Sequence, residues 1–176
     1  MLKHYALLLS IVLFSINGFG DNKFESDYTF CNHHKLKFFL KKIYDVYLCT
    51  NNKNSFLYSA IYQSDFSVFI KYNMGFESSY LAETSIESMG KNFVMSKFKQ
   101  QSYYNILANI FPNVEKGDVI EARYSKAGIV KFFFNNNDIG VISSDPIFTK
   151  KFLDIWLRYN ANAPKMQENL FGFVDE

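Results

Sequence analysis

The stretch KGDVIEARYSKAGIVKFFFNNNDIGVIS, residues 116–143, decides the fold. It contains three short runs of branched and aromatic residues that are typical of β-strands: 119–124, 129–134 and 139–143. The separators KAG (126–128) and NNND (135–138) consist of residues that form tight turns, because Gly and Asn tolerate positive φ. The stretch therefore predicts three consecutive strands joined by hairpins, which form an antiparallel sheet.

Further strands and helices are predicted on both sides of this stretch. The run from Leu36 to Cys49 is interpreted as a strand because it alternates over Ile43 to Leu48, and 66–72 is interpreted as another. Four helices are predicted from capping residues and helical spacing: 78–89, about 97–111, 145–159 and 163–172. Ser78 would cap the first, Pro112 would end the second, and Asp145-Pro146 would begin the third. The third helix has an apolar stripe of Phe148, Phe152, Ile155, Trp156 and Tyr159. Helices and hairpins occur in blocks, so the fold class is α+β, with helices covering one face of the sheet.

The first twenty residues have the pattern of a secretory signal peptide. Lys3 lies in a short basic start, an apolar stretch runs from Ala6 to Ile16, and the small residues Gly18 and Gly20 precede a polar segment. The apolar stretch is shorter than the roughly 20 residues that span a bilayer. We therefore expect residues 1–20 to be cleaved after Gly20 and residues 21–176 to form one exported domain, most simply periplasmic, with secretion also open. The alternative is an uncleaved N-terminal anchor.

Composition excludes several function classes. The chain has 176 residues, of which 48% are hydrophobic and 19% aromatic, and a formal net charge of +2. Such a chain has enough apolar area for a packed core, so it is not a disordered protein. The small net charge provides no electrostatic case for nucleic-acid binding. The oligomeric state stays open, and once a signal peptide is removed no stable membrane span is expected.

Two cysteines, Cys31 and Cys49, remain in the predicted exported chain. Because an exported protein meets an oxidising compartment, the two thiols can form a disulfide that closes a short loop. Two buried free thiols are the alternative.

Few residues offer reactive chemistry. His33 and His34 are adjacent, so they would point to opposite faces of a strand, and no further metal ligands lie at suitable spacing. There is no nucleophile elbow, phosphate-binding loop or dinucleotide motif. We therefore expect neither a hydrolase nor a cofactor.

Lysines are concentrated in one segment, at Lys35, Lys37, Lys41 and Lys42. Lys35 and Lys37 would share a strand face, where they could meet an anionic headgroup at the mouth of a pocket. A solvated face of the sheet is the alternative interpretation.

A resemblance to a known family rests on the order of several short segments. They are Ile43–Leu48, a helix containing Tyr80, the KGD turn at 116–118, the strand 139–142, Ile155-Trp156-Leu157 and the closing 169–172. In this order the chain resembles the chalcone isomerase-like family, in its bacterial exported branch, over about residues 28–172. The resemblance implies an open-faced β-sandwich, a large antiparallel sheet backed by a layer of helices, with a ligand cleft between them.

The resemblance also implies two activities, and the residues distinguish them. The plant enzymes of the family cyclise chalcones with an arginine that precedes the Tyr-rich strand, whereas other members are fatty-acid binders. This chain has only Arg123 and Arg158, both far downstream. Lys42 falls where the enzymes have a threonine, Tyr80 can match their helix tyrosine, and Glu87 replaces their asparagine.

Three hypotheses follow for the function. The first is a non-catalytic binding protein whose cleft holds a fatty acid or an aromatic ligand, with Lys37, Tyr44, Tyr80 and Glu87 as candidate polar contacts. The second is an isomerase of the chalcone isomerase type, with Tyr80 as its catalytic candidate. The third is a structural or partner-binding envelope protein with an exposed apolar patch.

Overall fold

The computed structural model describes residues 27–159 and 163–172, so the predicted signal peptide lies outside the described residues. One antiparallel sheet forms its centre, with its strands in the order of the chain. The strands are β1 (Phe30–Phe38), β2 (Lys41–Thr50), β3 (Phe66–Tyr72), β4 (Val119–Ser125), β5 (Ile129–Phe134) and β6 (Asn137–Ile142). The predicted strands 66–72 and 129–134 have the observed bounds, and 119–124 differs by one residue at its end.

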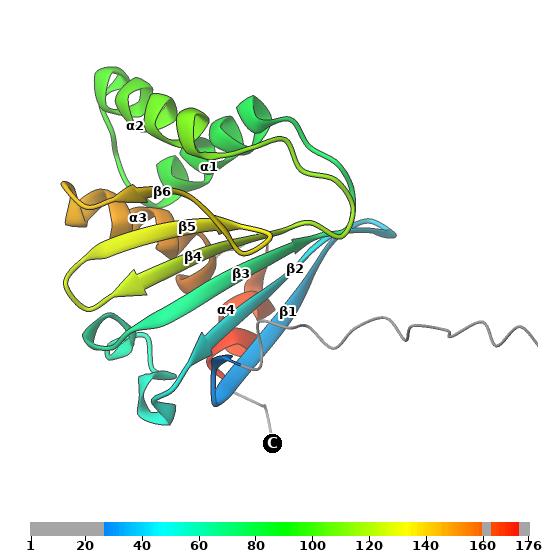
Figure 1. Ribbon diagram of the computed structural model, residues 1–176, viewed down its shortest axis with the longest axis vertical. Helices are drawn as coiled ribbons and strands as arrows, with labels where there is room; N and C mark the ends of the chain where they lie inside the picture. The colour runs from blue at the N-terminus through cyan, green and yellow to red at the C-terminus, as the bar shows by residue number, and fades with distance from the viewer. Residues whose placement is uncertain (1–26, 160–162, 173–176) are drawn as a thin grey trace, which may run out of the picture.

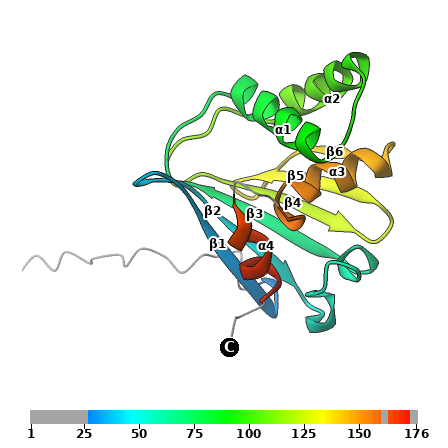
Figure 2. The ribbon, with the colours of Figure 1, turned by 180° about the vertical axis from the view of Figure 1, so that it is seen from behind.

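Helices lie on one side of this sheet. They are α1 (Ser78–Asn92), α2 (Lys97–Ile110), α3 (Pro146–Leu157) and α4 (Pro164–Phe171). The view from behind shows α3 and α4 across the sheet, and α1 and α2 beyond α3 next to β6 (Figure 2), whereas no labelled helix lies in front of the sheet in Figure 1. The predicted α+β architecture, a sheet backed by helices, is confirmed. No helix within 27–159 and 163–172 is long and apolar enough to cross a membrane.

The strand register separates two faces of the sheet. On the helix-covered face, rows of apolar side chains run across neighbouring strands, for example Leu48, Val68, Ala122 and Phe132, all buried. On the open face, Tyr47, Cys49 and Phe69 form a smaller buried cluster. The predicted alternation along residues 43–48 therefore holds from Tyr44 onward, since residues of opposite parity face opposite sides.

The predicted strand 36–49 is wrong as a single element. The structure divides it into β1 and β2, joined by a two-residue turn of Phe39 and Leu40, and β1 begins earlier, at Phe30. Phe39 has a φ of 53°, the left-handed region that glycine or asparagine usually occupies in such turns. Large apolar residues such as Phe39 and Leu40 are not typical of tight turns, so the residue pattern did not predict this hairpin.

The β5–β6 hairpin follows ordinary turn chemistry. Asn135 and Asn136 both have positive φ, which asparagine tolerates better than most residues. The predicted turn at 135–138 is therefore confirmed, although β6 begins at Asn137 rather than at residue 139.

A side chain caps the starts of α2 and α3, whereas α1 and α4 begin without a side-chain cap. Asp145 caps α3, accepting the N–H of Phe148 at 2.9 Å, as predicted. Ser78 is wrong as the cap of α1: the cap is Glu77, and the Ser78 N–H donates to the Asn113 side chain at 2.9 Å. The end of α3 at Leu157 leaves Tyr159 outside the helix and exposed, because the chain is extended from Arg158.

A disulfide joins Cys31 of β1 to Cys49 of β2, which the sequence left as one of two possibilities. The two residues are directly opposite in the register, and their Cα atoms are 4.2 Å apart. The bridge lies on the open face and fastens the edge strand to its neighbour.

Candidate functional site

A cavity of about 230 Å³ lies between the helix-covered face of the sheet and helices α1 and α3. Its lining is mostly aliphatic and aromatic: Leu36, Ile43, Tyr44, Ile70, Tyr72, Phe76, Tyr80, Leu81, Thr84, Ser85, Ser88, Phe111, Ile120, Ala122, Phe152, Ile155 and Trp156. No charged side chain is among these described residues. A mostly apolar pocket with a few placed polar groups is the usual form of a small-molecule site.

The sheet topology places the cavity at one end of the strands. Leu36 is near the end of β1 and Tyr44 near the start of β2, while Tyr72 ends β3 and Ile120 is the second residue of β4. In an antiparallel meander these positions lie at the same end, next to the turn that joins β1 and β2. That end is where the β1–β2 hairpin projects beyond the sheet in Figure 1.

A β-bulge shapes the strand wall. Leu36 pairs with Tyr44, but Lys37 pairs with Lys42, so Ile43 is an extra residue in β2. A bulge re-aims side chains that strict alternation would send to opposite faces. This irregularity explains why both Ile43 and Tyr44 line the cavity.

Tyr44 and Tyr72 are two polar residues of the lining that come from neighbouring strands of the sheet. The indole N–H of Trp156 donates to the Tyr44 hydroxyl at 3.2 Å, and the rings of Tyr44 and Tyr72 meet edge to face with centroids 6.4 Å apart. Burial raises the pKa of Tyr44 to about 12 despite the hydrogen bond from Trp156. Burial, and secondarily the nearby Tyr44, raises the pKa of Tyr72 as well. Both phenols therefore stay protonated and can donate to a ligand oxygen at neutral pH.

Helix α1 forms the opposite wall. The half-exposed Tyr80 stacks on Phe76 with ring centroids 5.4 Å apart. The hydroxyls of Thr84 and Ser85 donate to the carbonyls of Tyr80 and Leu81, at 2.8 and 2.7 Å. Because these hydroxyls are already engaged within the helix, this wall presents mostly ring and methyl surface to the cavity.

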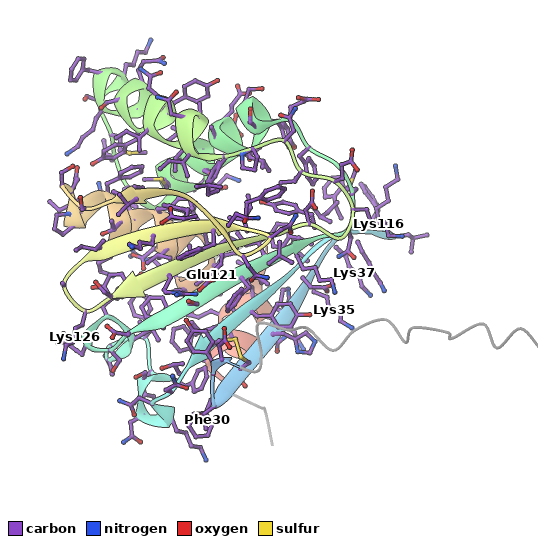
Figure 3. The ribbon with its side chains drawn as sticks, in the orientation of Figure 1. Phe30, Lys35, Lys37, Lys116, Glu121 and Lys126 are labelled. Carbon is purple, nitrogen blue, oxygen red and sulfur yellow. A yellow bond between two sulfur atoms is a disulfide. The ribbon has the colours of Figure 1, made fainter. Side chains whose placement is uncertain are left out.

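Neither arginine lines the cavity. Arg123 is on the open face of the sheet, where it pairs with Glu121 at 2.7 Å and covers the Phe133 ring at 4.4 Å. Figure 3 shows Glu121 near the middle of that face. Arg158 follows α3 and lies over the Phe93 ring at 5.4 Å. An arginine that stabilises a phenolate inside the cavity is thus missing from the described lining.

The structure brings together two of the four candidate binding residues. Tyr44 and Tyr80 line the cavity from opposite walls. Lys37 instead lines an open surface hollow along β1 with His33, His34 and Asn169, and Glu87 is an exposed residue of α1. Lys37 falls outside the cavity because it directly follows Leu36 on β1 and so faces the opposite side of the sheet, and Glu87 lies on the exposed part of α1.

Residue patterns alone missed Trp156 and Tyr72 as site residues. Each belongs to a correctly predicted element, Trp156 to the apolar stripe of α3 and Tyr72 to strand 66–72. Their polar groups, the Tyr hydroxyl and the Trp indole N–H, could have marked both as site residues, since these groups usually find a hydrogen-bond partner when buried.

The adjacent histidines do not act together in the structure. The His33 ring stacks on Tyr47 with centroids 5.6 Å apart, whereas His34 Nδ1 is 2.9 Å from the Asn169 amide nitrogen. Burial, followed by the charge of His33, lowers the pKa of His34. Among the described residues no cluster of three or more His, Cys, Asp or Glu side chains could hold a metal ion.

Comparison with solved structures identifies the architecture. A fatty-acid-binding protein of Arabidopsis thaliana superimposes with a TM-score of 0.59 at 12% sequence identity, covering 80% of this chain and 84% of that protein. The chain has the chalcone isomerase-like fold. At this identity the likeness concerns the fold alone. No protein family matches by sequence, and neither does any curated protein.

Proposed function

We propose that this protein is an exported, non-catalytic carrier or receptor of a small apolar ligand, which binds in the cavity between the sheet and helices α1 and α3. One observation carries the proposal: a cavity of about 230 Å³ whose lining is apolar except for uncharged hydroxyl and indole groups. The fatty-acid-binding protein of the same fold supports an apolar ligand of this kind. At a packing density of about 0.74 the cavity would enclose on the order of ten non-hydrogen atoms.

The lining also indicates what kind of polar group the ligand carries. The Tyr44 and Tyr72 hydroxyls can donate to a carbonyl, ester or hydroxyl oxygen. An ionised carboxylate would find no cation among the described lining residues, and burying an unpaired charge is costly. The proposed ligand is therefore an uncharged molecule with an acceptor oxygen, or a fatty acid whose carboxylate stays at the opening of the cavity.

We infer the cellular setting from the sequence pattern of residues 1–20. Cleavage after Gly20 would leave residues 21–176 as a single chalcone isomerase-like domain, which belongs to a bacterial exported branch of the family and is located in the periplasm. The Cys31–Cys49 disulfide supports an oxidising compartment. Intact-mass measurement of the exported chain tests the cleavage site.

Trp156 provides the readout for ligand binding, because it is the single tryptophan of the chain and lines the cavity. We expect its fluorescence to change on titration with methyl decanoate, and decanoate at neutral pH to bind no more tightly than the ester. Ser88→Phe, which fills the cavity from α1, should weaken binding at least tenfold. Ser79→Phe is the matched control, since Ser79 is an exposed residue of the same helix and does not line the cavity.

Two results would contradict the proposal. One is equal ligand affinity in the two phenylalanine variants, which would place the ligand elsewhere. The other is chalcone cyclisation well above the spontaneous rate that disappears in Tyr80→Phe, which would make the protein an isomerase. Mass spectrometry of what leaves the natively purified protein on denaturation identifies the natural ligand.

A further inference from the structure

The turn between β1 and β2 exposes three consecutive large apolar side chains. Phe38, Phe39 and Leu40 are 67%, 87% and 98% exposed. The Phe38 and Phe39 rings meet edge to face with centroids 4.8 Å apart, so they form one apolar tip. We call residues 38–40 the hairpin tip. Exposed apolar clusters of this kind mark contacts with proteins or membranes.

Lysines surround the hairpin tip. Lys37 immediately precedes it and Lys41 and Lys42 immediately follow it. All three are exposed, and none forms an ion pair with a described residue. Lys35 and Lys37 lie along β1 toward this end of the sheet, and Lys116 lies at the same end (Figure 3), although Glu115 and Asp118 flank Lys116 in sequence. Apolar side chains at a tip, with cations behind them, match the depth profile of an anionic bilayer surface.

Two local features of the hairpin oppose its stability in water. Phe39 has a φ of 53°, which is uncommon for a bulky residue, where glycine would fit without strain. Lys37 lies directly opposite Lys42 in the strand register, and like charges at such positions repel. An anionic surface would relieve the repulsion, and an apolar phase would take up the exposed rings. The backbone strain at Phe39 and the repulsion between Lys37 and Lys42 occur in the same hairpin, and such unfavourable features are typical of functional contacts.

We propose that the hairpin tip docks this protein on anionic lipid bilayers, with Phe38, Phe39 and Leu40 inserted at the level of the acyl chains and the flanking lysines on the phosphates. The tip is two residues beyond Leu36 and three before Ile43, both of which line the cavity. Docking would therefore bring the cavity against the membrane. The docking itself does not depend on the proposed ligand. A role of the docked state in passing a ligand between the membrane and the cavity rests on the proposed function.

Vesicle flotation with the ligand-free exported chain tests this proposal. We expect binding to vesicles of phosphatidylcholine with 30% phosphatidylglycerol to be at least tenfold tighter than binding to pure phosphatidylcholine, and to weaken at high salt. Phe39→Asn with Leu40→Asn should reduce binding to the anionic vesicles at least tenfold. The matched control is Val94→Asn with Phe98→Asn, which removes two equally exposed apolar residues at the α1–α2 connection.

Stability measurements separate docking from unfolding. Asparagine tolerates positive φ, so the tip variant should melt no lower than the wild type while its vesicle binding is lost. Ser88→Phe should still bind vesicles, which distinguishes a failure of docking from a failure of ligand binding. The proposal would be overturned by equal vesicle binding of the tip and control variants. A concentration-dependent dimer that only the tip variant loses would also overturn it, because the tip would then contact a second copy of the chain.

Discussion

Asp145 joins two helices through a single carboxylate. One oxygen accepts the Phe148 N–H at 2.9 Å and caps α3, while the other accepts the Tyr103 hydroxyl of α2 at 2.8 Å. The Tyr103 and Phe148 rings stack with centroids 3.9 Å apart. Although partial burial acts in the opposite direction, these hydrogen bonds lower the pKa of Asp145. The ionised form is therefore favoured in the folded protein.

Asp145→Ala should lower the free energy of unfolding by about 1–2 kcal/mol at pH 7, because it removes a helix cap. Asp145→Asn should cost less, since asparagine also caps helices. Because folding lowers the pKa of Asp145, its ionised carboxylate stabilises the fold fully at pH values above the ordinary pKa of 3.8. This stabilisation is lost as the pH falls through the pKa of Asp145 in the folded protein. Urea unfolding at pH 7 and pH 3 checks this, and a difference between wild type and Asp145→Ala that does not shrink in acid would contradict it.

At the scale of elements, the edge strand β1 is held from both of its faces. On the open face the Cys31–Cys49 disulfide joins it to β2, and on the other face α4 packs against it. The Asn32 side chain donates to the Leu170 carbonyl at 3.2 Å, beside the left-handed Gly172 that ends α4. These contacts hold the strand that carries Leu36 and the hairpin tip.

Removing the disulfide should destabilise the protein by about 3 kcal/mol, since it closes a loop with a sequence separation of 18. We expect Cys31→Ala with Cys49→Ala to show this loss in urea unfolding, and the wild type to show a similar loss when a reductant is present. The double variant itself should be insensitive to reductant. Identical unfolding curves of the wild type with and without reductant would contradict the prediction.

At the scale of the whole molecule, many of the described aromatic residues pack in the main hydrophobic core between the sheet and the helices. Phe132, Phe152 and Trp156 meet edge to face in series, with centroids 5.4 and 5.3 Å apart, and so link the sheet through α3 to the cavity. Several tyrosines are part of this core, with their hydroxyls bonded or facing the cavity. Packing of the whole molecule therefore favours the protonated form of these buried phenols.

The protein should lose stability as pH rises above about 10. Burial raises the pKa of Tyr44 to about 12 and, together with nearby acidic groups or phenols, raises those of Tyr62, Tyr72 and Tyr103. A pKa raised in the fold means that the stabilisation is complete below the ordinary value of 10.0 and is lost above it. Absorbance at 295 nm should show fewer ionised phenols at pH 10.5 in the folded protein than in urea. Superimposable titrations would contradict this.

Much of the fold was predictable because its signals are local. The asparagines at 135 and 136, the Asp145 cap and the strand 66–72 each depend on the conformational preferences of a few adjacent residues. The division of 36–49 into two strands was not predictable, because Phe39 and Leu40 form their turn against residue preference. The site was predictable only in part: Tyr44 and Tyr80 line the cavity, but the alternation of β1 after Leu36 and the orientation of α1 leave Lys37 and Glu87 outside it.

The sequence by itself determined the α+β class, the meander of β4 to β6 and an aromatic-rich chain with few reactive groups. Only the tertiary structure decided where the cavity lies, which face each tyrosine occupies, that the two cysteines are bridged and that an apolar tip projects among lysines. The physical reason is distance along the chain. Trp156 and Tyr44 are 112 residues apart, and only the register of the sheet and the packing of α3 across it bring them within hydrogen-bond distance.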